Sequence, residues 1–201
     1  MQNLDEVVDF YLKSETNFAL MITGDWGVGK TYYFKNVLKE KISNTSTYQN
    51  DSKKYRPILV SLFGINSIAD IQTEILMSIY PILKNKNLKL GLNITKSLMK
   101  AILQFNNLGG EFDIMPEEEN GRWIDFNELV ICFDDLERLS DKFSIEEVIG
   151  FINSLVENGN VKILIIANEN KINKDNYIIL KEKVVGNSIE FIVTPNFNTS
   201  S

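Results

Sequence analysis

Residues 24–31 read Gly-Asp-Trp-Gly-Val-Gly-Lys-Thr, and this segment constrains the fold more than any other part of the chain. It fits the pattern G-x-x-x-x-G-K-[ST], follows the apolar run Phe18–Thr23 and precedes apolar residues at helical spacing in 34–42. A glycine loop between a buried strand and a helix directs backbone N–H groups and the positive end of the helix toward an anion. The segment therefore predicts a strand, a phosphate-binding loop and a helix in that order.

The predicted phosphate contacts come from the loop itself. We expect the Lys30 ammonium to reach the β and γ phosphates, and the Thr31 hydroxyl to be a ligand of Mg²⁺, which prefers oxygen. The alternative is a glycine turn that matches by chance, but the fixed spacing of two glycines, a lysine and a hydroxyl makes that rare. The predicted nucleotide-binding residues are Gly24, Asp25, Trp26, Gly27, Val28, Gly29, Lys30 and Thr31.

A second apolar run, Leu129–Phe133, leads directly into a cluster of acidic residues. A phosphate-binding loop of this kind needs a neighbouring strand that ends in an acid, and Asp134 is predicted to hold Mg²⁺ there through water. Asp135 is the predicted catalytic carboxylate that orients or deprotonates the attacking water, and Glu137 is the competing base. The alternative for the cluster is a solvated acidic turn between a strand and a helix.

Two other residues complete the predicted catalytic set. Asn168 follows the apolar run Val161–Ala167 and is a candidate to sense the γ-phosphate or to position water. Asn170 would serve nearly as well, and a strand-terminal Asn is also a common turn former. Arg138 is expected to form an ion pair with Glu137, and its alternative is the catalytic role of a finger toward a neighbouring subunit.

The apolar runs of strand length alternate with segments of helical spacing, which predicts an α/β fold with a mainly parallel sheet and helices on both faces. The predicted strands are Phe18–Thr23, Arg56–Phe63, Leu129–Phe133, Val161–Ala167 and Ile189–Val193. The predicted helices are Leu4–Leu12, one over 34–42, Ser67–Tyr80, Thr95–Gln104, one from a capping box at Ser144 with Glu147, and Lys174–Val185. We expect one core over residues 1–195, with a loop at Ser43–Lys54, a lysine-rich helical segment at about 75–107, a loop at about 108–127 and a tail at 196–201.

Composition excludes several classes of site. The chain has no histidine, so histidine-activated nucleophiles and histidine-ligated metals are excluded, and its single cysteine, Cys132, provides no cysteine-rich zinc site. Cys132 lies in an apolar run and is expected to be a buried structural thiol. The net charge of −6 argues against a protein that coats nucleic acid. Without a leader or a long apolar stretch, we expect a cytoplasmic protein with no membrane span.

The sequence favours ATP over other substrates of phosphate-binding loops. A guanine-specific protein would carry N-K-x-D, but residues 170–173 read Asn-Lys-Ile-Asn, and the terminal amide presents one carbonyl acceptor where Asp accepts two hydrogen bonds. Small-molecule kinases close an arginine-rich lid over the phosphates, whereas this chain has only Arg56, Arg122 and Arg138. An ATP-driven switch fits better.

These motifs resemble those of the KAP family of P-loop NTPases. Residues 24–31 are similar to its G-x-W-G-x-G-K-[ST], Cys132–Arg138 to its apolar-D-D-L-D-R segment, and Lys181–Val185 with Phe191–Pro195 to its E-K-I-I and F-x-x-P ending. The resemblance implies a three-layer ATPase of the additional-strand class with sheet order 5-1-4-3-2. It also implies a switch module of a larger protein, in bacteria often linked to exclusion of phage. Where this chain has Asn168, members of the family often have an Asp.

A lysine-rich stretch is not explained by nucleotide binding. No acidic residue occurs between Glu74 and Glu111. The stretch is either a solvated helical hairpin or a docking surface for an acidic partner, nucleic acid or a membrane face. The predicted docking residues are Lys84, Lys86, Lys89, Lys96 and Lys100.

The sequence thus supports one main functional hypothesis and two alternatives. The main hypothesis is Mg²⁺-dependent binding and hydrolysis of ATP that switches a conformation or an assembly, by self-association or with a protein partner. The first alternative is a nucleotide-binding module that does not hydrolyse ATP unless a partner or a C-terminal lid completes it. A nucleic-acid motor is disfavoured by the acidic balance and by the lack of helicase motifs.

Overall fold

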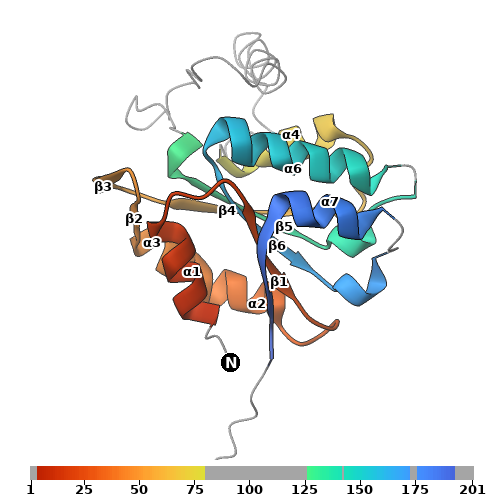
Figure 1. Cartoon of the computed structure of the whole chain (residues 1–201), viewed down its shortest axis with the longest axis horizontal. Coiled ribbons are helices and arrows are strands. Elements are labelled where there is room, and N and C mark those ends of the chain that lie inside the picture. Colours follow the sequence, from red (N-terminus) through yellow and green to blue (C-terminus); the bar gives the residue numbers. More distant parts are fainter. Residues whose placement is uncertain (1–3, 80–125, 142, 173–175, 193–201) are drawn as a thin grey trace, which may run out of the picture.

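The computed structural model describes residues 4–79, 126–141, 143–172 and 176–192, which build an α/β fold around one five-stranded parallel sheet (Figure 1). The strands of this sheet are β1 (Ala19–Thr23), β4 (Arg56–Ser61), β5 (Leu129–Asp134), β6 (Lys162–Ala167) and β7 (Val185–Glu190). Their spatial order is β4-β5-β6-β1-β7, and all neighbours are parallel. Numbered along the chain, this is 5-1-4-3-2, the order that the family resemblance implied.

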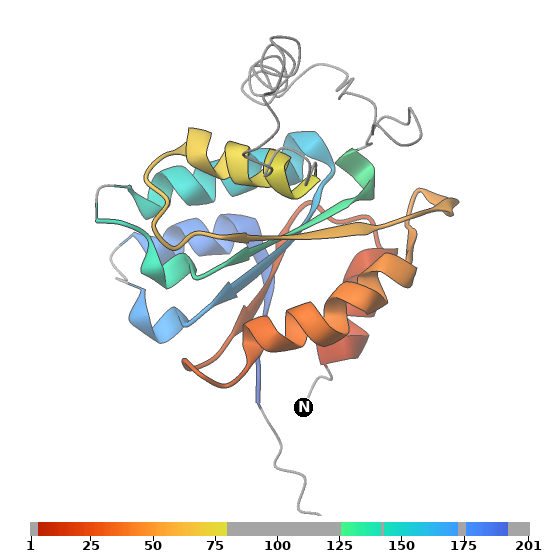
Figure 2. The ribbon, with the colours of Figure 1, turned by 180° about the vertical axis from the view of Figure 1, so that it is seen from behind.

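Helices cover both faces of the sheet, as predicted (Figures 1 and 2). One face packs against α1 (Leu4–Lys13) and the helical segment that follows β1, and the other against α4 (Ile68–Ile79), α6 (Ile145–Gly159) and α7 (Tyr177–Val184). The central strands β5 and β6 are buried along their whole length. Strands covered on both faces need no polar alternation, which is why they read as continuous apolar runs.

The helical segment after the phosphate-binding loop is continuous but irregular. It consists of α2 (Lys30–Tyr33), a π-helical turn η1 (Phe34–Leu38) and α3 (Lys39–Asn44). Phe34, Leu38 and Ile42 are buried as the helical spacing predicted, but Val37 is 41% exposed. Val37 therefore lies outside the core face to which its spacing assigned it.

Two segments differ from the sequence prediction. Residues 43–54 were expected to be a loop, but α3 continues to Asn44 and an antiparallel hairpin follows, formed by β2 (Ser46–Thr47) and β3 (Asn50–Lys54). The hairpin lies outside the main sheet and is mostly exposed, so no apolar alternation marks it. The last strand begins at Val185 and ends at Glu190, four residues before the predicted start and three before the predicted end.

The early start of β7 has a local cause. A Cβ on Gly186 would lie 2.3 Å from the Phe18 ring, so glycine lets the strand approach this side chain closely. As an edge strand, β7 also carries exposed polar residues, which hide it from a search for apolar runs.

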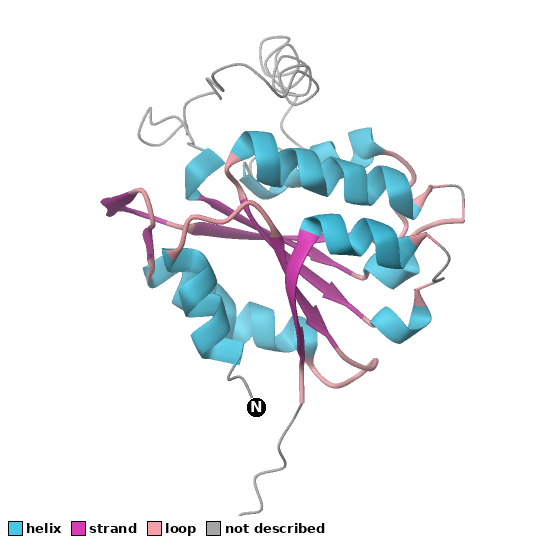
Figure 3. Ribbon diagram, viewed as in Figure 1, coloured by secondary structure: helices cyan, strands magenta, loops and turns pink. Residues whose placement is uncertain are grey.

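The other predicted elements agree with the structure within a few residues. Ser144 caps α6, because its side chain accepts a 3.2 Å hydrogen bond from the Glu147 backbone N–H. The first residues of the predicted lysine-rich segment belong to α4, and the last residues of the predicted loop form a short 3₁₀ helix, η3 (Phe126–Glu128). The predicted helix Thr95–Gln104 lies outside the described residues. Figure 3 shows the resulting three layers, with helices on either side of the strands.

Candidate functional site

The predicted site residues lie at the carboxyl ends of β1, β5 and β6, which are adjacent in the sheet. The loop after β1 leads directly into α2, confirming the strand–loop–helix order. Gly27 and Gly29 have φ angles of 78° and 95°, in the left-handed region that side chains with a Cβ rarely adopt. The loop can therefore curl only because these positions are glycine.

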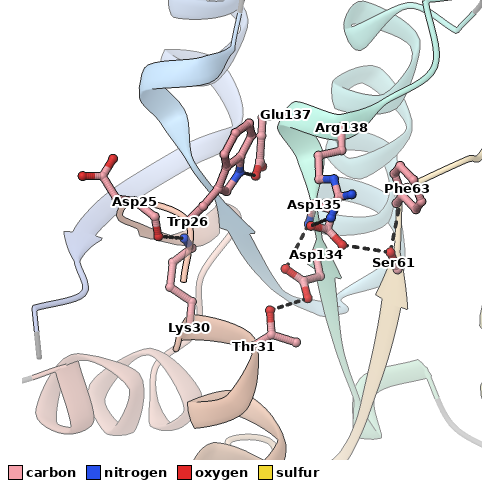
Figure 4. Close-up of polar contacts among 10 residues, drawn as sticks. All are labelled: Asp25, Trp26, Lys30, Thr31, Ser61, Phe63, Asp134, Asp135, Glu137 and Arg138. Atoms are coloured by element: carbon pink, nitrogen blue, oxygen red, sulfur yellow. Dashed lines mark hydrogen bonds and ion pairs between the residues drawn. The ribbon is translucent and has the colours of Figure 1, made fainter. Parts of the chain in front are cut away.

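The Lys30 side chain is fastened across the loop (Figure 4). Its Nζ donates hydrogen bonds to the backbone oxygens of Gly24 at 2.6 Å and Asp25 at 2.9 Å. Burial lowers the pKa of Lys30, and nearby carboxylates oppose that shift, Glu137 most strongly and then Asp134. The carboxylates thus offset part of the effect of burial on the pKa of this ammonium group.

Thr31 and Asp134, the two predicted metal ligands, are in direct contact. The Thr31 Oγ1 donates a 2.7 Å hydrogen bond to Asp134 Oδ2, and Asp134 Oδ1 accepts a 2.9 Å bond from the Asp135 backbone N–H. Burial raises the pKa of Asp134, and the Thr31 hydrogen bond opposes that shift. A hydroxyl and a carboxylate meeting beside a phosphate-binding loop are the hard oxygen ligands that Mg²⁺ uses together with water and substrate phosphates, so these residues fit the ion.

Asp135 is turned toward the neighbouring strand β4. Its backbone is left-handed, with φ of 62°, and it directly precedes the 3₁₀ helix η4 (Leu136–Arg138). Ser61, the last residue of β4, donates a 3.1 Å hydrogen bond to Asp135 Oδ2, and Arg138 Nη1 lies 3.4 Å from Asp135 Oδ1. The Arg138 guanidinium also stacks 4.1 Å from the centre of the Phe63 ring. The expected ion pair of Arg138 with Glu137 is therefore wrong, since its carboxylate partner is Asp135.

Glu137 instead contacts the tip of the loop. The Trp26 indole Nε1 donates a 2.6 Å hydrogen bond to Glu137 Oε1, as Figure 4 shows. The other carboxylate oxygen, Oε2, is buried and has no hydrogen-bond partner among the described residues. The Lys171 ammonium lies 5.7 Å from the centre of the Trp26 ring. Lys171 is the last residue of η5 (Glu169–Lys171), the 3₁₀ helix after β6. The loop tip therefore contacts η4, which follows β5, and η5, which follows β6.

Asn168 follows β6 and is 1% exposed, whereas its alternative Asn170 is exposed. The Asn168 Oδ1 is buried and has no hydrogen-bond partner within the described part of the chain. An unpaired buried carbonyl costs about 1–3 kcal/mol, which is unusual outside a functional position. This burial favours Asn168 over Asn170 as the polar residue of the site.

Sequence reasoning missed three contributors to the site: Ser61, Phe63 and Lys171. Each reaches the acidic cluster or the loop tip from a segment distant along the chain, and no local motif marks it. Cys132 is fully buried, as predicted, and burial raises the pKa of its thiol. The predicted docking residues lie outside the described residues, at Lys84, Lys86, Lys89, Lys96 and Lys100.

In the described residues, no helix has the length and apolar character needed to cross a membrane.

Comparisons with known proteins identify the family of this chain. A solved structure described as "Structure of Drosophila ORC bound to DNA" is similar, with a TM-score of 0.49 and 11% identity over 93% of this chain and 40% of that chain. A search of curated proteins found no match. The KAP family P-loop domain matches residues 3–110 and 117–192, and the chain therefore belongs to the KAP family of P-loop NTPases.

Proposed function

We propose that this domain binds ATP with Mg²⁺ and hydrolyses it, and that the nucleotide state switches a conformation or an assembly. The observation that carries the proposal is the 2.7 Å hydrogen bond between Thr31 and Asp134. It joins the phosphate-binding loop to the acidic end of β5, within the same group of side chains as the Lys30 ammonium.

The loop and the two predicted metal ligands bind and orient the substrate. Lys30 donates to two backbone oxygens of the loop, and phosphate oxygens of ATP compete for the same ammonium. Thr31, and Asp134 through water, would hold Mg²⁺, which when bound would neutralise charge that develops on the β and γ phosphates. The backbone of residues 24–29 supplies the anion site, so the acidic net charge of the chain does not prevent binding.

Asp135 is the proposed catalytic carboxylate. It orients or deprotonates the attacking water, while Ser61 and Arg138 hold its two oxygens. Asn168 senses the γ-phosphate or positions the water, and in the second role the water donates a hydrogen bond to its buried carbonyl oxygen. The alternative role of Arg138, as a finger toward a neighbouring subunit, requires it to leave Asp135.

Steady-state phosphate release from ATP, with and without Mg²⁺, tests the proposed activity. Turnover should require Mg²⁺ and fall at least about 100-fold in Lys30→Ala, because the substitution removes the only side-chain ammonium in the loop. Lys35→Ala is the matched control, since Lys35 is an exposed lysine one turn further along the same helical segment. Turnover that survives Lys30→Ala would refute the site.

A second candidate function is nucleotide binding without hydrolysis. Its support is the arrangement of Asp135, whose two carboxylate oxygens are held by Ser61 and Arg138. In that case ATP and ADP would bind, as measured by calorimetry, with no phosphate release until a partner protein is added.

The biological setting remains the expectation drawn from the family resemblance. In this setting the domain acts as a cytoplasmic switch module of a bacterial phage-defence or signalling assembly, by self-association or with a protein partner. Phage plating on bacteria that carry the intact gene or its Lys30→Ala variant tests this setting, because a defence role requires the intact site to lower plating.

A further inference from the structure

We infer that Glu137 is a positioning residue that fixes the tip of the phosphate-binding loop through the Trp26 indole, and that it is not the catalytic base. The inference rests on the proposed function, because the loop it positions is the proposed ATP site. It also settles a choice between two carboxylates, Asp135 and Glu137, which are only two residues apart.

The first support is the way the loop tip is held. Trp26 is 60% exposed, so packing against the core contributes little to its position. Its indole N–H instead donates a 2.6 Å hydrogen bond to Glu137 Oε1, and a bond to an ionised acceptor is stronger than one between neutral groups. Lys171 stands 5.7 Å from the ring centre. The loop tip is thus fastened to the segments that follow β5 and β6.

The second support is where the two carboxylates lie. Figure 4 shows Glu137 against the Trp26 indole, whereas Asp135 lies beside Ser61 and Arg138. The contact of Glu137 is therefore with the phosphate-binding loop.

The hydrogen-bonding state of Glu137 also disfavours a role as base. Its Oε1 is taken by the indole, and its Oε2 is buried without a partner among the described residues. A general base must lie within hydrogen-bond reach of the water it deprotonates. Asp135 also has partners, Ser61 and Arg138, but these contacts span 3.1 and 3.4 Å, so water displaces them more easily than it displaces the 2.6 Å bond of the indole to Glu137.

Three substitutions separate the two roles. Glu137→Gln keeps an oxygen that accepts from the indole but cannot act as a base. Glu137→Ala removes the acceptor, and Trp26→Phe keeps an aromatic ring but removes the donor. Asp141→Asn makes the same change of charge on an exposed turn residue and is the matched control.

The first measurement needs no turnover. In a Trp123→Phe background, Trp26 is the only tryptophan, and ¹⁵N labelling of its indole gives one N–H signal. We expect a shifted, exchange-protected signal in the parent and in Glu137→Gln, and a solvent-like signal in Glu137→Ala. A solvent-like signal in the parent would overturn the inference.

The second measurement is steady-state kinetics. We expect KM for ATP to rise about tenfold in Glu137→Ala and in Trp26→Phe, which is the size of effect that the loss of one hydrogen bond has. The kcat of both variants should stay within threefold of the parent value, and Glu137→Gln should have the KM of the parent. A fall in kcat of about 100-fold in Glu137→Gln would instead identify Glu137 as the base. If the parent binds ADP without releasing phosphate, the proposed hydrolysis fails, and ADP affinity across the same variants replaces KM as the test.

Discussion

Lys30 and Lys162 are two buried lysines at opposite ends of the sheet, and their surroundings differ in kind. Lys30 follows the carboxyl end of β1, whereas Lys162 is the first residue of β6. Burial lowers the pKa of both, for Lys162 to about 8. Each ammonium donates two short hydrogen bonds, so the number of hydrogen bonds does not distinguish them.

The neighbours of Lys162 form a closed cage. Its Nζ donates 2.6 Å hydrogen bonds to the Ser14 backbone oxygen and to Thr16 Oγ1. It also lies 4.8 Å from the centre of the Tyr11 ring and 4.7 Å from that of Tyr48. Aromatic faces attract a desolvated cation but offer no site for an anion. This lysine ties the start of β6 to the segment after α1.

The neighbours of Lys30 are exchangeable. It is held by two carbonyls of a glycine loop, and carboxylates surround it. Phosphate oxygens satisfy such an ammonium as well as carbonyls do. One carboxylate, Glu15, opposes the effect of burial on the pKa of Lys162, whereas four oppose it at Lys30. The comparison teaches that burial and a lowered pKa do not identify a functional lysine, whereas a cluster of exchangeable polar groups and several carboxylates does. Changes at the Lys30 end should therefore affect catalysis, and changes at the Lys162 end should affect stability.

Asp135→Asn should give the largest effect and tests the catalytic half of this comparison. We expect phosphate release to fall by about 10²–10⁴-fold, because an amide cannot accept the proton of the attacking water. The stability should change by less than about 1 kcal/mol, since Asn tolerates the left-handed backbone at this position and the partners are exposed. Phosphate release and urea unfolding measure the two effects.

The control for Asp135→Asn is ADP affinity, which should stay within a few-fold because the loop is untouched. Retention of more than a tenth of the turnover would show that another group acts as the base, with Glu137 the next candidate.

Lys162→Met tests the structural role of Lys162 through the pH dependence of the free energy of unfolding. The folded-state pKa of Lys162 is about 8, below its ordinary 10.5, so between these values the unfolded chain binds the proton that the folded chain has released. The stability of the parent should therefore rise with pH across this window, relative to Lys162→Met, by roughly 3 kcal/mol. The difference between the two proteins cancels the contribution of tyrosine titration to the pH dependence of stability, including that of Tyr11, whose pKa is raised by burial.

The measurement for Lys162→Met is urea unfolding at a series of pH values from 7 to about 10.5, with ADP affinity followed in parallel. ADP affinity should be unchanged, because the cage lies at the other end of the sheet. Parallel stability curves for the two proteins would show that the lysine is not desolvated in the folded state.

The sequence predicted the central sheet and the strand, loop and helix around residues 24–31, because both are marked locally. The strands β5 and β6 are covered on both faces and must be apolar throughout, and the loop at 24–31 carries a fixed spacing of glycine, lysine and hydroxyl. Family resemblance supplied the strand order, which periodicity alone does not determine.

The remainder required the structure, for physical reasons. The edge strand β7 and the β2–β3 hairpin are exposed and polar, so no apolar pattern marks them. The contact between Trp26 and Glu137 joins residues 111 positions apart, and the partners of Asp135 come from β4 and η4. Long-range polar contacts depend on how strands are ordered in the sheet, and they leave no periodic signal in the chain.

Arg138→Ala should change the stability as little as Asp135→Asn does, and it tests the weakest contact at the Lys30 end of the sheet. The pair with Asp135 spans 3.4 Å and Arg138 is exposed, so the loss of the pair should cost no more than about 1 kcal/mol in urea unfolding. If Arg138 serves its own Asp135, equal mixing of Arg138→Ala with Asp135→Asn should leave phosphate release at the mean of the two variants. A finger that acts on a neighbouring subunit predicts turnover above that mean, because mixed assemblies then contain sites with an intact Asp135 and an intact Arg138 from the neighbouring subunit. Turnover above the mean, rising with protein concentration, would therefore show that Arg138 acts between subunits.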